Sequence, residues 1–406
     1  MPSTAACADW SAWRAGSVPL VSGEDSANGN GAVEMPLFTT RRLVQTVLVV
    51  FVLLGCIYFL FPKLVGLGDA LSRLDEADPL WIAVAIGFNV VAYATYIALF
   101  KAVVGGDALR LKWAETYEIN MAGVAATLLF SAGGAGGIAL TYWALRKAGM
   151  RRRDVARRMV AFITLHYAFY PLALIAFGVL LRTGVLEGKD SVELTIVPAA
   201  VAGLLILIAI LIALIPPDLE RRLAPYAHGE KARSFLESAA KVPATVGEGF
   251  RFALGLFAHP SRGGLAVLGA AGFWAASIGV LWASFHAFGV QVPLAVVVQG
   301  FFLGMVANLF PLAPAGVGAV DAGMIGAFVL FGIPETAVFP AVLVFRLVAF
   351  WMPIPPGIIA FIQLRKTVHR WEHEGLPVTR GGNAESDLEP AIGGFAMDRR
   401  GGYYKK

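Results

Sequence analysis

Long, uninterrupted apolar runs alternate with short polar segments along most of this chain. A helical run of about 18 apolar residues or more crosses the roughly 30 Å hydrocarbon layer of a bilayer. Six runs reach this length: 44–61, 80–100, 159–181, 194–215, 264–288 and 337–362. The first lies far from the N-terminus and has no small-residue cleavage site, so we expect a retained span. The pattern predicts an all-α polytopic membrane protein.

Two further apolar stretches, 113–145 and 294–332, are broken in the middle by glycine, in FSAGGAGGIAL and FPLAPAGVGAV. The neighbouring loops give the orientation, because short cytoplasmic loops are rich in Lys and Arg. Residues 146–158 carry seven basic side chains against Asp154 alone, and residues 363–370 carry three. Both loops are predicted to be cytoplasmic. The loops predicted to lie outside are net acidic: 62–79 and 182–193.

The first glycine stretch is followed by a basic loop and preceded by a span that has just returned to the cytoplasm. It must therefore enter and leave the membrane by the same face. Two full crossings need about 40 residues, and 113–145 provides 33. The same reasoning places 294–332 on the opposite face. We expect six full spans plus two re-entrant, Gly-rich helical hairpins arranged as an inverted repeat. Two ordinary kinked helices are the alternative.

A short sequence echo agrees with the repeat. Five residues of the first glycine stretch recur 180 residues later: Leu129, Phe130, Ala135, Gly136 and Ala139 match Leu309, Phe310, Ala315, Gly316 and Ala319. The predicted segments are a disordered tail at 1–40, a first membrane repeat at 41–193, a second at 194–370 and a disordered tail at 371–406. Within the second repeat, residues 216–263 mix basic and acidic side chains around apolar positions and predict an amphipathic helix on the inner leaflet.

Composition excludes a water-soluble fold, since 57% of residues are hydrophobic, 15% are charged and the mean hydropathy is +0.69. The net charge of +5 lies in the loops, where membrane orientation explains it, so no nucleic-acid role is expected. Both termini are predicted to be cytoplasmic, at the inner membrane. No phosphate-binding loop, nucleophile elbow or paired-cysteine motif is present, and we expect no cofactor, no metal site and no enzyme activity.

Arg346 stands alone in the apolar run AVFPAVLVFRLVAFWMPIPPG. An ionised side chain at this depth costs at least about 2.5 kcal/mol unless it is paired or hydrated. Asp321 is the expected partner, because helix geometry puts both residues roughly 13–15 Å from the outer surface. Two interpretations stay open. The two side chains form a permanent structural pair, or a substrate phosphate competes with Asp321 for the guanidinium.

The glycine turns are expected to face a polar cavity, because non-helical backbone at membrane depth needs polar partners. Each turn starts a half-helix whose N-terminal N–H groups favour an anion. Close helix packing through small residues is the alternative. His166 and Tyr170 lie at the equivalent depth of the other half and are candidates for headgroup contact, or for an ordinary buried histidine. The residues predicted to contact substrate are Arg346, Asp321, Gly316, Gly318, Asn308, Gly136, Gly137, His166 and Tyr170.

The second glycine stretch and the last span resemble the transmembrane region of lysylphosphatidylglycerol synthases. That pattern runs P-G-G-x-G-x-x-E, then G-x-P, an intramembrane Arg and a Pro/Gly ending. Its counterparts here are Pro314, Ala315, Gly316, Val317, Gly318, Asp321, Gly332, Pro334, Arg346, Pro353 and Gly357. Residues 300–362 carry the resemblance well and 128–158 more loosely. Asp321 replaces the usual Glu, and the family's A-G-E with its following Arg is here Ala135, Gly136, Gly137 and Leu140.

The resemblance implies movement of lipids between leaflets, or a membrane function based on lipid binding. The aminoacyl-transferring domain of the full synthases has no room here, because 44 residues follow Ile362. We therefore predict a flippase-like transporter for a phosphate-bearing phospholipid or polyprenyl lipid, with anionic membrane lipids as its partners. An integral-membrane enzyme that modifies such a lipid is the first alternative, and a transporter of small anions or ions is the second. Lipid identity, direction, energy source and oligomeric state do not follow from the residues.

Overall fold

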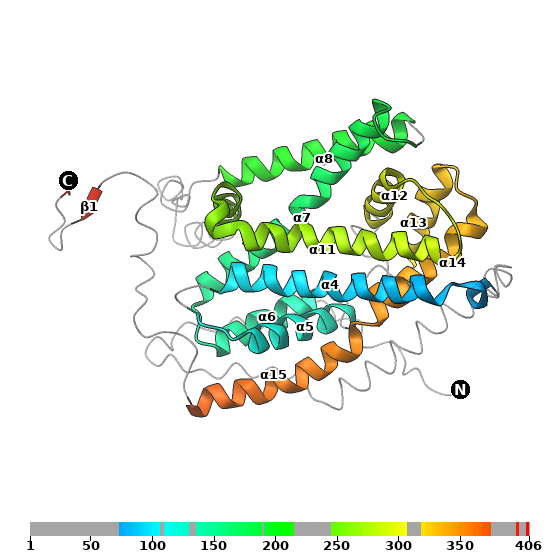
Figure 1. The fold of residues 1–406 in the computed structure, drawn as a ribbon. Coiled ribbons are helices and arrows are strands. Elements are labelled where there is room, and N and C mark those ends of the chain that lie inside the picture. The colour runs from blue at the N-terminus through cyan, green and yellow to red at the C-terminus, as the bar shows by residue number, and fades with distance from the viewer. Residues whose placement is uncertain are drawn as a thin grey trace, which may run out of the picture. The chain divides into compact units, whose positions relative to one another are not determined.

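The structure is a computed structural model that describes residues 73–105, 109–129, 135–188, 191–214, 245–306, 318–374, 395–397 and 403–405. The predicted N-terminal tail, the first predicted span at 44–61 and most of the predicted C-terminal tail lie outside these residues. Figure 1 shows the arrangement of the helices. They are α4 (Pro79–Val104), α5 (Trp113–Leu129), α6 (Ala135–Lys147), α7 (Arg152–Arg182), α8 (Val192–Ala213), α11 (Pro260–Ala287), α12 (Leu294–Val306), α13 (Ala319–Leu330), α14 (Glu335–Arg346) and α15 (Ile354–Glu374).

Shorter elements complete the described part of the chain. A 3₁₀ turn, η2 (Arg73–Glu76), precedes α4, and a π-helical turn, η6 (Leu347–Trp351), joins α14 to α15. Residues 245–258 are also helical, within the segment predicted to carry an amphipathic helix. Strands β1 (Phe395–Met397) and β2 (Tyr403–Lys405) pair antiparallel, with Phe395 opposite Lys405.

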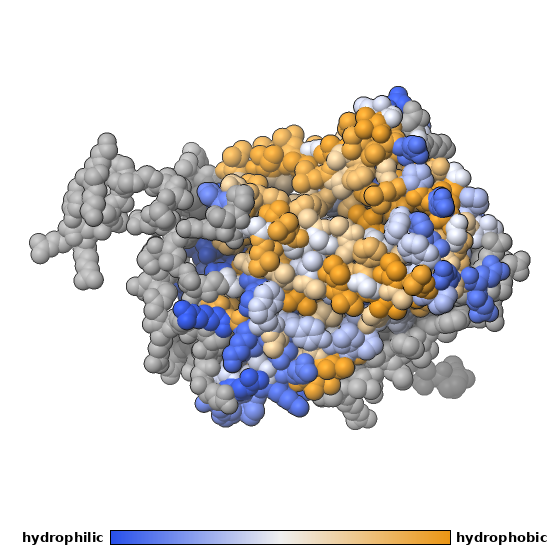
Figure 2. Space-filling model, in the orientation of Figure 1, coloured by the Kyte–Doolittle hydropathy of each residue, from blue (hydrophilic) through white to orange (hydrophobic). Residues whose placement is uncertain are grey.

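Five helical segments in the described residues are long and apolar enough to cross a membrane: Pro79–Val104, Arg152–Arg182, Val192–Ala213, Gly263–Ala287 and Glu335–His373. They coincide with five of the six predicted spans, so the prediction of a multi-pass helical membrane protein is confirmed. Large apolar side chains of α8 remain exposed, among them Val201, Leu204 and Leu211. Figure 2 shows a hydrophobic surface over α8 and α11, with hydrophilic residues toward the helix ends. Such a surface is expected of helices that face lipid.

The structure corrects two predicted boundaries. The basic loop predicted at 146–158 shortens to 148–151, because α7 already starts at Arg152, and the last span continues to Glu374 instead of ending at 362. Arg, Lys and Glu are good helix formers, so a helix does not end where its apolar run ends. At the start of α7, Asp154 lies in the first turn and accepts a hydrogen bond of 2.8 Å from Arg151 Nε. A carboxylate in this position also compensates the helix dipole.

Helices α4 and α11 pack antiparallel along most of their length. Glycines of α11 make this close approach possible: a methyl group added at Gly269 would lie 2.7 Å from the backbone nitrogen of Leu99, and one at Gly279 would lie 2.7 Å from the ring of Phe88. The residue numbers of these contacts fall along α4 as they rise along α11, as antiparallel packing requires. Small residues at helix contacts are the usual means of tight packing in membranes.

Each glycine stretch folds as two short helices packed against one another. Gly123 of α5 faces Thr141 of α6, and Thr127 faces Gly137, so this pair is antiparallel. The helices have 17 and 13 residues in the first pair, and α12 and α13 have 13 and 12. At 1.5 Å per residue, each is about 18–26 Å long, which is shorter than the roughly 30 Å of hydrocarbon.

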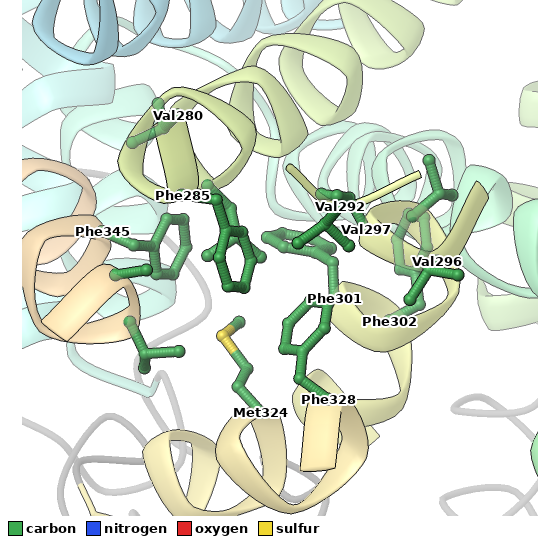
Figure 3. Packing of buried hydrophobic residues seen from close by; sticks show 14 of the residues in the cluster. Val280, Phe285, Val292, Val296, Val297, Phe301, Phe302, Met324, Phe328 and Phe345 are labelled. Carbon is green, nitrogen blue, oxygen red and sulfur yellow. The ribbon is translucent and has the colours of Figure 1, made fainter. Parts of the chain in front are cut away.

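Aromatic packing holds the second helix pair against α11 and α14. Gly300 of α12 approaches the ring of Phe328 in α13, where an added methyl group would lie 2.6 Å from the ring. Phe328 in turn packs edge to face on Phe285 of α11, with ring centroids 4.9 Å apart, and Phe301 packs on Phe345 of α14 at 5.8 Å. Figure 3 shows these rings around Met324. This core fixes the start of α13 beside the end of α14.

Candidate functional site

Arg346 and Asp321 form an ion pair inside this helical core. Arg346 is the last residue of α14, Asp321 lies in the first turn of α13, and the guanidinium Nε donates a hydrogen bond to Oδ1 of the carboxylate. Arg346 is 7% exposed, and its side chain comes from a segment long and apolar enough to cross a membrane. The predicted partner of the intramembrane arginine is therefore confirmed.

The second oxygen of Asp321 caps the helix to which it belongs. Gly318 N–H donates a 2.9 Å hydrogen bond to Oδ2, and Gly318 has φ +81°, a conformation that glycine adopts without strain. One carboxylate thus serves a guanidinium and a helix N-terminus, two groups that attract anions. In this structure the carboxylate oxygens of Asp321 serve both of these groups.

The π-helical turn η6 starts directly after Arg346. The Arg346 guanidinium lies 5.5 Å from the ring centre of Phe350, within this turn. Asn89 Nδ2 donates a 2.9 Å hydrogen bond to the carbonyl of Val348, and Tyr93 Oη donates one of 3.3 Å to Ala349. Both donors belong to α4. Asn89 and Tyr93 thus bond α4 to the π turn. The sequence pattern gave no reason to single out Tyr93 or a π turn.

His166 and Tyr170 lie on α7, away from this ion pair in sequence and on another helix. The imidazole of His166 is packed among aromatic rings with centroid distances of 4.8–6.3 Å: Tyr96, Phe162, Tyr167, Phe273 and Trp274. Its Nδ1 is buried without a hydrogen-bond partner among the described residues. Tyr170 Oη donates to the carbonyl of Phe302 in α12. These contacts favour an ordinary buried histidine, and headgroup contact stays a prediction.

The other predicted site residues divide into packing residues and residues outside the described part. Gly137 is packed so tightly that an added methyl group would overlap Thr127 and the backbone carbonyl of Gly123. This supports close helix packing as its role. Gly136 is half-buried at the start of α6. Asn308 and Gly316 lie outside the described residues.

Both ends of the first helix pair lie at the same end of α15. Glu115, near the start of α5, is buried and accepts a 3.2 Å hydrogen bond from Trp371 Nε1, and Lys147, at the end of α6, forms a 2.8 Å ion pair with Glu372. Lys101, near the end of α4, also lies here and donates to the carbonyl of Leu111.

Both ends of the second helix pair lie at the opposite end of α4. Val290, before α12, and Thr336, after α13, line one pocket of about 470 Å³ together with Asp78, which caps the start of α4. The residues that flank the second helix pair therefore lie together at this pocket.

This chain is similar to known membrane proteins. The family model for the lysylphosphatidylglycerol synthase transmembrane region matches residues 44–357. Two curated relatives, both called UPF0104 membrane protein and both from Methanothermobacter thermautotrophicus, are 34% identical to this chain. The first match covers 87 residues, 21% of this chain and 26% of the relative, and the second covers 79 residues, 20% and 24%. The matched part spans about a quarter of each relative's length.

Proposed function

Because this chain belongs to the lysylphosphatidylglycerol synthase transmembrane-region family, we propose that it moves a phosphate-bearing lipid across the inner membrane. The observation that carries the proposal is the ion pair between Arg346 and Asp321. A buried arginine within a membrane-crossing segment is costly, and such residues usually belong to a substrate or ion pathway. The proposed substrate is a phospholipid or polyprenyl phosphate whose headgroup enters the protein while its tails stay in the bilayer.

The chemistry of the pair suits a phosphate. The guanidinium offers parallel N–H donors that match phosphate oxygens, and the Gly318 N–H offers a third donor at the start of α13. In the proposed bound state, phosphate oxygens replace the two Asp321 oxygens on these donors. The carboxylate is thus an internal substitute for the ligand, and the bound state needs no new cationic group.

The proposed transport mechanism is rocking of two inverted repeats around this site. Three pairs of contacts support the repeat. Helices α4 and α11, at equivalent places in the two halves, pack antiparallel on one another. Each also donates a side-chain hydrogen bond to a carbonyl in a membrane-crossing segment of the other half, from Asn89 to Val348 and from Trp274 to His166 at 2.6 Å. Gly178 of α7 packs near Gln299 of α12, and Gly357 of α15 packs on Ala125 of α5.

The proposed re-entrant hairpins can be tested by cysteine accessibility. In a background with Cys7→Ser and Cys56→Ala, we expect Lys112→Cys and Arg151→Cys, which flank the first hairpin, to react only with reagent on the cytoplasmic side. Gln291→Cys and Glu335→Cys, which flank the second, should react only from the other side. All four positions are exposed. Flanks of one hairpin that react from different faces would show a complete crossing and contradict the inverted repeat.

The transport proposal is tested with the purified full chain in proteoliposomes that carry a fluorescent lipid in one leaflet. We expect faster leaflet exchange than in protein-free vesicles, with an anionic phospholipid or a polyprenyl phosphate moving faster than a neutral glycolipid. Lipid extracts taken before and after the assay should contain the same species, because we propose no enzyme activity. Equal rates with and without protein for every phosphate-bearing lipid would rule the proposal out, and a new lipid species would favour a lipid-modifying enzyme.

A further inference from the structure

The helix that carries Arg346 changes its geometry directly after this residue. Met352 N–H donates a 3.2 Å hydrogen bond to Leu347, five residues before it, so the turn from Leu347 to Trp351 is π-helical. A π turn holds one residue more than the α turn it replaces, and isolated π turns are frequent at functional sites. If this turn became α-helical, Arg346 would rotate by about 100° and shift by about 1.5 Å relative to α15.

A proline explains why one carbonyl of this turn needs a donor from outside in each of the two registers. In a π turn, the carbonyl of Val348 would accept a hydrogen bond from the N–H of residue 353. In an α turn, the N–H of residue 353 would instead donate to the carbonyl of Ala349. Residue 353 is proline and has no N–H. Asn89 Nδ2 binds the first of these carbonyls and Tyr93 Oη binds the second. The two donors are four residues apart, on one face of α4, and Asn89 is 4% exposed.

The other half of the protein shows the same arrangement without a π turn. Pro171 follows His166 by five residues, as Pro353 follows Val348, and the carbonyl of His166 accepts from Trp274 of α11. Yet α7 is a continuous α-helix from Arg152 to Arg182. A proline and an external donor are therefore compatible with α geometry, so the π turn of η6 is one of two conformations open to such a helix.

We propose that η6 is a register switch for the candidate site, and that Asn89 is the positioning residue that stabilises its π state. In this state Arg346 points at Asp321 and the ring of Phe350 lies beside the guanidinium. In the α state Arg346 turns away from Asp321 and becomes free to stay with a phosphate. The role of the switch in transport rests on the proposed function. The existence of the two registers does not depend on it.

The registers can be measured without transport. Phenylglyoxal modifies arginine, and peptide mass spectrometry reads the modification at Arg346 in the full chain. Loss of the positioning hydrogen bond in the variant Asn89→Ala should raise the rate at Arg346 roughly 2- to 12-fold, because one neutral hydrogen bond contributes a few-fold to the equilibrium. Arg158 is the internal reference, since it binds the carbonyls at the end of α4. Its rate should not change.

A deletion tests the switch from the other direction. Removing Ala349 turns η6 into an α turn while Arg346 keeps its present orientation. Pro353 then stands four residues after Val348, so the Val348 carbonyl again lacks a main-chain donor. Asn89 can therefore still bind this carbonyl. We expect Arg346 to be as protected as in the wild type, while lipid transport falls at least about tenfold. Ser277→Ala is the matched control, because its hydroxyl binds a carbonyl within α11. It should change neither value.

Three results separate the outcomes. An unchanged rate at Arg346 in Asn89→Ala, or a rate that rises equally at Arg158, would overturn the positioning role. Wild-type transport by the deletion variant would overturn the switch. If the wild type moves no lipid at all, the proposed function fails, and the phenylglyoxal rates alone decide whether the two registers exist.

Discussion

Replacement of Arg346 by alanine is expected to lower lipid transport about 10- to 100-fold. Each charge-assisted hydrogen bond to a buried anion contributes about 1.5–3 kcal/mol, and a factor of ten corresponds to about 1.4 kcal/mol. The variant should also unfold more easily, since removing one partner of a buried ion pair costs about 3–5 kcal/mol. The proteoliposome assay measures the first effect, and thermal unfolding in detergent measures the second.

The double variant Arg346→Ala, Asp321→Ala separates a substrate site from a structural pair. Without both charges no buried carboxylate is left unpaired, so stability should return toward that of the wild type. Transport should stay low, because the guanidinium that binds phosphate is still absent. Arg346→Lys keeps the charge but lacks the fork of N–H donors, and intermediate transport is expected. Recovery of both stability and transport in the double variant would show that the pair is only structural.

Gly137→Ala is expected to disrupt the first helix pair. A methyl group at this position would overlap the Thr127 hydroxyl and the backbone carbonyl of Gly123. A backbone carbonyl cannot move aside as a side chain can, so α5 and α6 must separate, at a cost of about 1–3 kcal/mol or more. We expect a lower melting temperature in detergent and loss of transport.

Gly87→Ala provides the matched comparison for this substitution. Gly87 lies within α4, and nothing is found within 4 Å of an added methyl group. In a helix, alanine is more favourable than glycine by about 1 kcal/mol, so this variant should be as stable as the wild type or more stable. If the two substitutions lowered the melting temperature equally, tight packing between α5 and α6 would not be the cause.

Apolar length was sufficient to predict the five segments of the described residues that are long and apolar enough to cross a membrane. Lys and Arg around residues 146–158 indicated that the stretch before them starts and ends on one side, and in the structure both of its ends lie beside the end of α15. The pairing of Arg346 with Asp321 followed from depth alone, because a buried charge leaves few choices of partner. Each of these features depends mainly on one contribution to the free energy, and a contribution of this kind can be inferred from a single sequence.

The details around the ion pair depend on residues far apart in the chain. Asn89 reaches a carbonyl 259 residues away, and no local pattern indicates which donor of α4 meets which carbonyl of η6. Pro353 shows that a main-chain donor is missing, but it does not show whether the helix forms a kink or a π turn as a result. The burial of Glu115 under Trp371 was missed for the same reason, since the sequence places Glu115 only near a helix start.

The tethered carboxylate of Asp321 has a consequence for selectivity in the proposed site. A group held in place by its own chain acts at a high effective concentration, in the millimolar range or above. Chloride and other abundant, weakly bound anions must compete with the Asp321 carboxylate for the guanidinium. They are excluded because they bind more weakly than the carboxylate, and not because of their size. A lipid headgroup with several oxygens, which arrives in the plane of the bilayer, would compete more effectively with the carboxylate, so the proposed site would be neutralised without a substrate and still be able to bind one.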